Sequence, residues 1–391
     1  MFAVFQSVRK VALWMLSLIA VLTIAACEPG GLTSGGPSID TSKPVPVALL
    51  VPMGSAQSGD AILAQSLENA ARLAIADLQG VEIDLRVYDT AGSAQVAAAK
   101  AVEAVDAGAK IILGPVYAEA ANAAGLAVRG RNVNVLAFSN NPGIAGGNVF
   151  ILGPTFDTTA TRLTQFAARQ GKTSILTVHG TDVAGELGRN AIQKAINSTS
   201  VKSAGAIGYE LSQQSVIDSI PRVRDTAVSS GADAIFLTAT TAGALPLFTQ
   251  LLPEAGVTGD TVQYIGLTRW DIPSQTLELP GVQGGWFALP DPGQTQQFRS
   301  RYQTAYSGTP HPIGGLAYDG IAAIGALVGA GRADALSGAA LTQGAGFKGV
   351  SGIFRLRPDG TNERGLAVAT IQNRQVVVID PAPTSFSGAG S

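Results

Sequence analysis

The sequence is poor in residues that make covalent or metal cross-links. Cys27 is the single cysteine among 391 residues, so no disulfide can form within the chain and a packed core must stabilise the fold. The two histidines, His179 and His311, lie far apart, and neither has a second histidine or cysteine at ligand spacing. We therefore expect no metal site.

Charge of either sign is also scarce. Charged residues make up 14% of the chain, and the net charge is −2 at pH 7. Nucleic-acid binding depends on basic residues that neutralise phosphates, and the sequence has no basic cluster for that purpose. The apolar fraction of 46% is ample for a core, and a chain of this length is expected to form about two domains.

Motifs of common enzyme classes are missing as well. The sequence has no GxSxG nucleophile elbow and no Walker A loop. Its one GxGxxG match, GAGFKG at 344–349, follows a helix-like segment rather than a strand, so turn glycines explain it better than a dinucleotide site. These absences predict a protein that is not an enzyme and that carries no cofactor.

The residues before Cys27 suggest why the chain has this one cysteine. Arg9 and Lys10 precede an uncharged apolar run that ends in small residues directly before Cys27, which is typical of a secretory signal peptide over 1–26. The letters TIAAC resemble a bacterial lipobox, in which the cysteine is lipidated. A plain signal peptide with an incidental cysteine is the alternative, whereas a catalytic thiol would need a base nearby. Residues 27–43 are rich in glycine, serine and proline and are predicted to form a flexible tether.

From Val45 onward, strand patterns alternate with helix patterns. Residues 45–52 form a short apolar run, residues 61–79 carry apolar side chains at helical spacing, and residues 81–90 alternate apolar and polar as a half-buried strand does. The same alternation continues to residue 268. It predicts an α/β fold of right-handed βαβ units on parallel sheets, arranged in two lobes.

Four segments fall in the order and spacing of one known family. They are GDAILAQSLENAARLAIADLQG, AKIILGPVYAEAANAAGLAVRGRNVNVLAFSNNP, GLAYDGIAAIGALVGAG and GFKGVSGIFRLRPDGTNERGLAVATIQ. Over about 44–381 the chain resembles the leucine-binding branch of the type I periplasmic binding proteins. The resemblance implies two Rossmann-like lobes, three crossovers and a ligand cleft between the lobes. The implied ranges are lobe one at about 44–153 and 291–345, lobe two at about 154–290 and 346–381, and a disordered tail at 382–391.

Loops after the predicted strands place polar or small residues where parallel sheets bind ligands, beyond the carboxyl ends of the strands. The first four, at 53–60, 114–120, 138–143 and 179–186, are each expected to precede a helix whose N–H groups suit a carboxylate. The fifth, at 266–271, places a guanidinium beside an indole, which predicts a flat, cation-bearing wall. The residues predicted to line the cleft are Ser55, Tyr117, Ser139, Asn140, Asp182, Arg269 and Trp270.

The sequence departs from amino-acid receptors of this family at the cleft. Those receptors offer small hydroxyl residues where Ala118, Glu119 and Ala120 stand, and an acid for the α-amino group where Arg269 and Trp270 stand. In its lipid-anchor signal, in these departures and in the segments GLTRWD and GGWFALPDP, the chain resembles more closely the penicillin-binding protein activators, which are outer-membrane lipoproteins of this fold.

That closer resemblance implies a non-catalytic regulator of peptidoglycan synthesis, lipid-anchored in the periplasm at the outer membrane, with a peptidoglycan synthase as its partner. It implies no other contact with the membrane. The alternative is the receptor of a branched-chain-type amino-acid ABC importer, whose partner is the permease. In either case the cleft is expected to take at most a small polar ligand.

Overall fold

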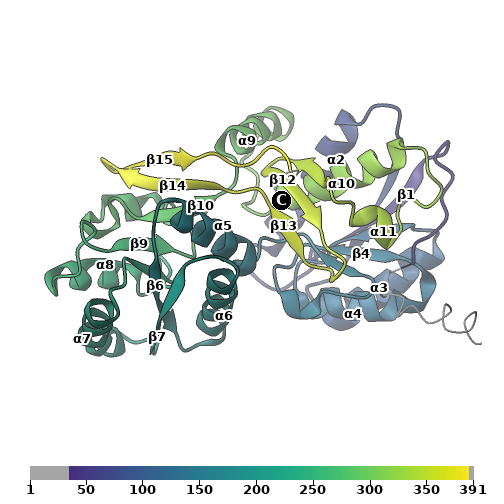
Figure 1. Cartoon of the computed structure of the whole chain (residues 1–391). Helices are drawn as coiled ribbons and strands as arrows, with labels where there is room; N and C mark the ends of the chain where they lie inside the picture. Colours follow the sequence, from purple (N-terminus) through teal and green to yellow (C-terminus); the bar gives the residue numbers. More distant parts are fainter. Residues whose placement is uncertain (1–34, 387–391) are drawn as a thin grey trace, which may run out of the picture.

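The computed structural model describes residues 35–386 as two lobes, each a largely parallel sheet covered by helices on both faces (Figure 1). The predicted signal peptide and Cys27 lie outside the described residues. In the part of the chain from 35 to 386, no helix combines the length and hydropathy needed to cross a membrane.

Lobe one begins with a sheet of five parallel strands in the order β2-β1-β3-β4-β5. Its first elements are β1 (Val45–Val51), α2 (Asp60–Asp77), β2 (Ile83–Asp89), α3 (Ala94–Asp106), β3 (Ile111–Leu113), α4 (Ala118–Val128), η1 (Arg129–Arg131), β4 (Asn134–Ala137), η2 (Pro142–Ile144) and β5 (Val149–Ile151).

Successive side chains of β1 show why this sheet has two covered faces. Val47, Leu49 and Val51 belong to the same buried cluster as the apolar face of α2, whereas Ala48 and Leu50 pack with α3 and α4 on the other face. Both faces of a parallel strand are thus buried, which explains its continuous apolar sequence.

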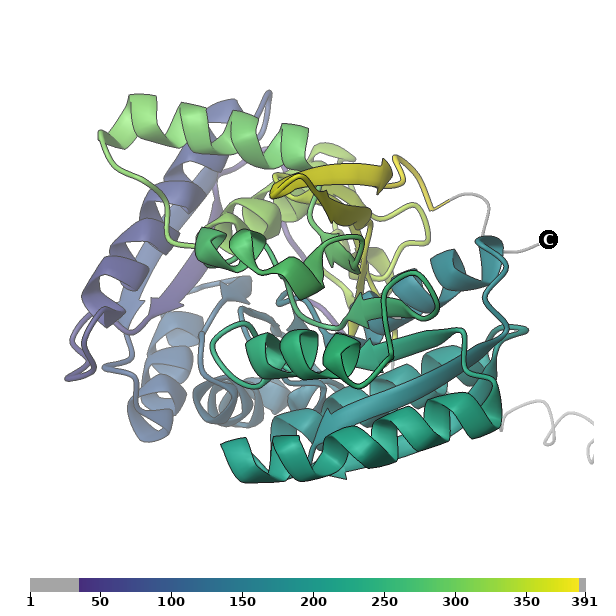
Figure 2. The ribbon, with the colours of Figure 1, turned by 90° about the vertical axis from the view of Figure 1, so that its left-hand side faces the viewer.

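Lobe two has a sheet of seven strands in the order β15-β14-β10-β9-β8-β6-β7, in which β14 and β15 run antiparallel to their neighbours. Figure 2 looks onto this lobe, with lobe one behind it. Its first elements are α5 (Phe156–Arg169), β6 (Ser174–Gly180), α6 (Val183–Asn197), β7 (Lys202–Tyr209), α7 (Gln213–Ser230), β8 (Ala234–Leu237), α8 (Leu245–Glu254), β9 (Gln263–Gly266), η3 (Ser274–Glu278), η4 (Pro280–Val282) and β10 (Trp286–Leu289).

The chain then returns to lobe one, adds a small antiparallel sheet to it, and enters lobe two a second time. These last elements are α9 (Pro292–Tyr306), α10 (Gly315–Gly329), α11 (Gly338–Leu341), β11 (Phe347–Gly349), β12 (Gly352–Leu356), β13 (Asn362–Arg364), β14 (Ala367–Gln372) and β15 (Gln375–Asp380). The two-lobed α/β fold with parallel sheets is therefore confirmed, and three crossovers join the lobes.

One predicted lobe boundary is wrong. Residues 346–381 were assigned to lobe two, yet Phe347, Phe354 and Leu356 belong to the core cluster of lobe one, together with Ile321 and Ile324 of α10. In Figure 1 the sheet of β11, β12 and β13 accordingly lies beside α10. The chain enters lobe two only at about Leu366, because the apolar side chains of β11 and β12 are complementary to α10.

The described ends of the chain are packed rather than flexible, contrary to prediction. Ile39 is 7% exposed in the core of lobe one, and its N–H donates to the carbonyl oxygen of Ala333 at 2.9 Å. The predicted tether of 27–43 therefore ends at the latest at Gly35, whose carbonyl accepts a hydrogen bond from Asn134.

The predicted tail at 382–391 likewise starts with ordered packing. Ala382 is buried in the core of lobe two. The guanidinium carbon of Arg355, on β12, lies over the Phe386 ring, 4.6 Å from the ring centroid. We call residues 381–386 the C-terminal strap, because they lead from lobe two back to the small sheet of lobe one.

Candidate functional site

The carboxyl ends of the strands form one edge on each lobe, and the five predicted loops lie at these edges. On lobe one this edge holds the loops after β1, β2, β3 and β4. The loop at 138–143 leads into η2, a 3-10 helix of three residues, and then into β5, so no α-helix follows it as one follows the other three loops. Helices α2 and α4 do start at this edge, and neither has a side chain capping its first N–H groups.

On the lobe-one edge, two loops meet through a hydrogen bond between residues far apart in sequence. The Tyr117 hydroxyl donates to Oδ1 of Asp60 at 2.5 Å. The hydrogen bond to Asp60, followed by partial burial and the negative charge of Asp60, raises the pKa of Tyr117 to about 12. Asp60 itself was not predicted as a site residue, although it stands at the end of a predicted loop.

The other predicted residues of this edge make short-range hydrogen bonds. The Ser55 Oγ accepts from the backbone N–H of Gln57, and the Ser139 Oγ accepts from the N–H of Asn141, each at 3.1 Å. Asn140 is exposed. The structure therefore places Ser55, Tyr117, Ser139 and Asn140 on one edge, with much of their hydrogen-bonding capacity used locally.

The lobe-two edge contains a cavity of about 400 Å³ at the ends of β6, β7 and β8. Asp182 is the predicted residue that lines it, and among its described lining residues Asp182 is the one charged side chain. The carboxylate caps α6 by accepting from the N–H of Gly185 at 3.2 Å. The remaining lining is mostly small or apolar and includes Tyr209, Leu211, Val216, Thr238, Leu247 and Thr268.

Sequence reasoning missed Tyr209, which closes this cavity beside Asp182. Tyr209 is 3% exposed, and burial followed by the charge of Asp182 raises the pKa of its hydroxyl to about 12. Its position at the last residue of β7 was the available signal. Lobe two thus offers an acid and a tyrosine next to an apolar surface.

The predicted wall of Arg269 and Trp270 is wrong. The Trp270 side chain is 0% exposed and stacks on Phe287, with ring centroids 6.4 Å apart. It fits there because Gly266 and Gly285 have no Cβ atoms to occupy the same space. Arg269 donates from Nε to Oδ1 of Asp271 at 2.8 Å, so its charge is already paired.

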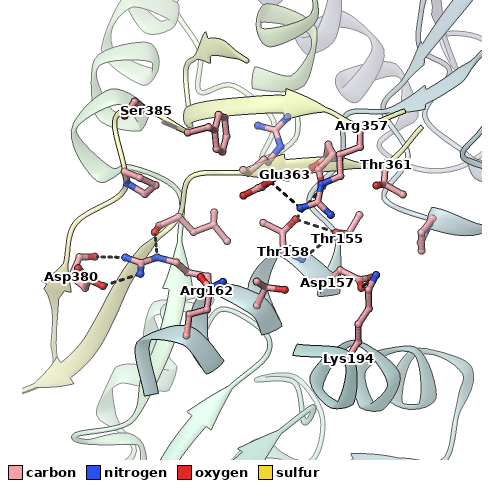
Figure 3. A pocket seen from close by; sticks show the side chains of 18 of the residues that line it. Thr155, Asp157, Thr158, Arg162, Lys194, Arg357, Thr361, Glu363, Asp380 and Ser385 are labelled. Carbon is pink, nitrogen blue, oxygen red and sulfur yellow. Dashed lines mark hydrogen bonds and ion pairs between the residues drawn. The ribbon is translucent and has the colours of Figure 1, made fainter. Parts of the chain in front are cut away.

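A second cavity, of about 500 Å³, lies away from the strand ends, beside the crossovers (Figure 3). Ion pairs line it: Arg162 with Asp380 at 2.8 Å, Arg357 with Glu363 at 2.9 Å, and Lys194 with Asp157 at 2.9 Å. Burial tends to raise the pKa of Asp380, but hydrogen bonds from Arg162 and Arg169 outweigh it and lower that pKa. No local sequence pattern indicates this cavity, since its lining residues come from distant segments.

Next to that cavity, buried polar side chains fix the crossovers. Arg364 pairs with Asp319 at 2.8 Å, and its Nε donates to the carbonyl oxygen of Leu152 at 3.0 Å. The Asn362 Nδ2 donates to the carbonyl oxygens of Ile151 and Gly153 at 2.9 and 2.8 Å. These bonds link the first crossover, between β5 and α5, to the third, between β13 and β14.

The fold matches known structures of solute-binding proteins. A Rhodospirillum rubrum protein assigned to branched-chain amino acid ABC transport has a TM-score of 0.74 and 20% identity, over 86% of this chain and 100% of that one. A branched-chain amino acid ABC transporter periplasmic ligand-binding protein of Burkholderia xenovorans LB400 has a TM-score of 0.65 and 19% identity, over 86% and 96% of the two chains.

A third similar structure contains a ligand. An ABC transporter substrate-binding protein of Desulfitobacterium hafniense in complex with leucine has a TM-score of 0.61 and 18% identity, over 86% of this chain and 100% of that one. At these identities the likeness concerns the fold alone. No curated protein matches the chain in sequence.

The sequence itself decides the family. The family model described as "Periplasmic binding protein" matches residues 44–375, from the first residue before β1 to the first residue of β15. This range includes both lobes, all three crossovers and the two strand-end edges described above. The chain therefore belongs to the periplasmic binding protein family.

Proposed function

We propose that the protein is the non-catalytic solute-binding receptor of an ABC importer and that it takes an amino-acid-like solute. The observation that carries the proposal is the lobe-two cavity, in which the Asp182 carboxylate lies beside Tyr209 and an apolar surface. A ligand ammonium needs such an anion, because burying the charge alone costs several kcal/mol. The similar structures assigned to branched-chain amino acid transport support this choice over a regulator.

The same geometry gives each part of the solute a place. Its ammonium group pairs with Asp182, and its apolar body lies against Leu211, Val216 and Leu247. Its carboxylate accepts from the uncapped N–H groups at the start of α2 or α4 on lobe one. Membership of the family implies a periplasmic location, and the partner is the permease of the importer.

Binding by the purified chain tests the proposal. Saturation at a hundred times Kd stabilises a protein by about 2.7 kcal/mol, so amino acids at millimolar concentration should raise the melting temperature clearly. Asp182→Asn should abolish the shift, whereas Asp225→Asn, at an exposed pair on α7, should leave it unchanged. If no amino acid shifts the melting temperature, or if Asp182→Asn binds normally, the proposal is wrong.

A regulator of peptidoglycan synthases is the second candidate, and one observation favours it. The hydrogen-bonding groups of the lobe-one edge are largely used within that edge, as in the Tyr117–Asp60 pair, which leaves fewer for a ligand. Stimulation of a purified penicillin-binding protein by the chain, in the absence of any amino-acid binding, would establish this function. Amino-acid binding without stimulation would dismiss it.

Anchoring through Cys27 is a separate part of the proposal and rests on the sequence order before it. We expect the wild-type protein to fractionate with membranes, the outer membrane in particular, and a Cys27→Ala variant to be released into the periplasm. A variant that stays with the membrane as the wild type does would contradict a lipid anchor.

A further inference from the structure

We infer that the lobe-one edge of the cleft binds a primary ammonium group through Asp60, Ser55 and Tyr117, next to Gly92. The inference rests on the proposed function and narrows its substrate class. The solute then carries an amino group beyond the one that pairs with Asp182.

The first observation is a buried carboxylate oxygen that has no partner. Asp60 is 5% exposed, and its Oδ1 accepts from Tyr117, but its Oδ2 has no hydrogen-bond partner in the described structure. A buried charged oxygen left unsatisfied is costly, so native structures rarely keep one without a reason such as a bound ligand.

The second observation is that the loop after β2 passes close to these oxygens at a residue that has no side chain. A Cβ atom at Gly92 would lie 3.0 Å from Ser55 Oγ and 3.6 Å from Asp60 Oδ2. Gly92 has a φ of 69°, where other residues are strained, so the position favours the absence of a side chain. The loops after β1 and β2 therefore meet beside Asp60, and Tyr117, after β3, donates to the same carboxylate.

The chemistry of these groups matches an ammonium. An ammonium has three N–H donors, and three acceptors are at hand: Asp60 Oδ2, Ser55 Oγ and the lone pairs of the Tyr117 hydroxyl, whose own proton goes to Oδ1. A charge-assisted bond to Oδ2 would be the strongest of them.

The surrounding charge also favours a cation. The described loops at 53–60, 90–93 and 114–117 contain no lysine or arginine, and Asp89 adds a second carboxylate that accepts from the N–H groups of Gly54 and Ala91. Calcium takes six to eight oxygen ligands, and no group of three or more acidic, histidine or cysteine side chains is gathered for a metal between residues 35 and 386. A nitrogen cation with three directed donors fits the three acceptors better.

Two kinds of solute share this chemistry: an amino acid with an ammonium-bearing side chain, and a diamine without a carboxylate. Calorimetric titration of the purified chain with lysine, norleucine and cadaverine separates them, because lysine differs from norleucine chiefly in its terminal ammonium. We expect lysine to bind at least about tenfold more tightly than norleucine. If cadaverine binds as tightly as lysine, the solute is a diamine. If lysine binds and cadaverine does not, the solute is an amino acid with an ammonium-bearing side chain.

Variants assign the effect to Asp60. Asp60→Asn should weaken lysine or cadaverine binding by roughly 10- to 100-fold and leave norleucine within about twofold. Asp106→Asn, at an exposed pair on α3, is the matched control and should change neither. Should Asp60→Asn fail to fold, Ser55→Ala, at a loop position, should weaken lysine selectively by several-fold.

The outcomes separate this inference from the proposed function. Equal affinities for lysine and norleucine, with both lost in Asp182→Asn, would overturn the ammonium site and keep the receptor. Binding of none of the three compounds, nor of leucine, would overturn both. A lysine preference that survives both Asp60→Asn and Ser55→Ala would also reject the site.

Discussion

The two strand-end edges of this protein have the same topological position and opposite character. On the lobe-one edge the polar side chains form hydrogen bonds within the edge: Ser55 and Ser139 accept from nearby backbone N–H groups, and Tyr117 donates to Asp60, 57 residues away in the sequence. The lobe-two edge leaves a cavity of about 400 Å³ with a single acid above an apolar lining. The comparison teaches that fold and family fix where a cleft lies, while a few side chains decide how much of each edge remains available to a ligand.

The largest expected effect comes from removing a buried aromatic side chain next to the lobe-two edge. Trp270→Ala should destabilise the protein by about 3–5 kcal/mol, because it empties a fully buried indole site between Gly266 and Gly285. Arg269→Ala is the neighbouring control and should cost less than about 1 kcal/mol, since its ion pair is partly exposed. Urea unfolding followed by circular dichroism measures both. If Trp270→Ala destabilises the protein no more than Arg269→Ala does, the Trp270 side chain is not buried, and the predicted exposed wall of Arg269 and Trp270 is supported instead.

The next effect concerns the internal pairing of the lobe-one edge. Tyr117→Phe should cost about 1–3 kcal/mol, because the Asp60 carboxylate loses its hydrogen-bond donor. The raised pKa of Tyr117, about 12 against an ordinary value near 10, gives the effect a pH dependence. A raised folded pKa means that the stabilisation is complete below pH 10 and is lost as the pH rises through 12.

Unfolding measured in parallel for wild type and Tyr117→Phe tests this pH dependence. The difference in unfolding free energy should shrink between pH 10 and 12, while Tyr209 and Tyr264 titrate equally in both proteins. A constant difference across that interval would contradict the hydrogen bond as its cause.

Substitutions at Asp182 separate its two roles on the lobe-two edge. Asp182→Ala should destabilise the fold by about 1 kcal/mol, because α6 loses its N-cap, and should also abolish solute binding. Asp182→Ser keeps a capping oxygen but removes the charge, so it should bind no solute while retaining most of the stability. Equal stability losses in the two variants would argue against the capping role.

The smallest effect concerns the link between the lobes. Phe386→Ala removes the ring under Arg355 and should cost about 0.5–1 kcal/mol, as expected of a cation–π contact near the surface. Thermal unfolding compared with Val228→Ala, an exposed apolar position on α7, measures the difference. Indistinguishable melting temperatures would mean that the strap adds no stability.

Much of the fold could be predicted because its signals are local. The apolar run of β1 and the helical spacing of Leu63, Leu67 and Ala70 depend only on neighbouring residues. Asp182 could be predicted to lie at the strand-end edge for the same reason, since it stands two residues after β6 and caps α6.

The errors have a common physical cause, which is packing between distant segments. Trp270 stands among polar neighbours, yet Gly266 and Gly285 open a buried place for it. Likewise, the sequence shows Ile39 as a single apolar residue in a segment rich in glycine and serine. In the structure its N–H donates to the carbonyl oxygen of Ala333, in a distant loop. Neither outcome follows from the composition of the segment concerned.

The early packing of the N-terminal segment has a consequence for how the protein sits in the cell envelope. Cys27 precedes Gly35 by eight residues, and a fully extended chain of that length spans at most roughly 28 Å. With a lipid on Cys27, the start of lobe one at Gly35 would therefore be held within that distance of the bilayer surface, whereas a flexible tether over 27–43 would reach about twice as far. A membrane protein of the same bilayer would then contact lobe one close to that surface, whereas one in the opposite bilayer would have to extend toward it.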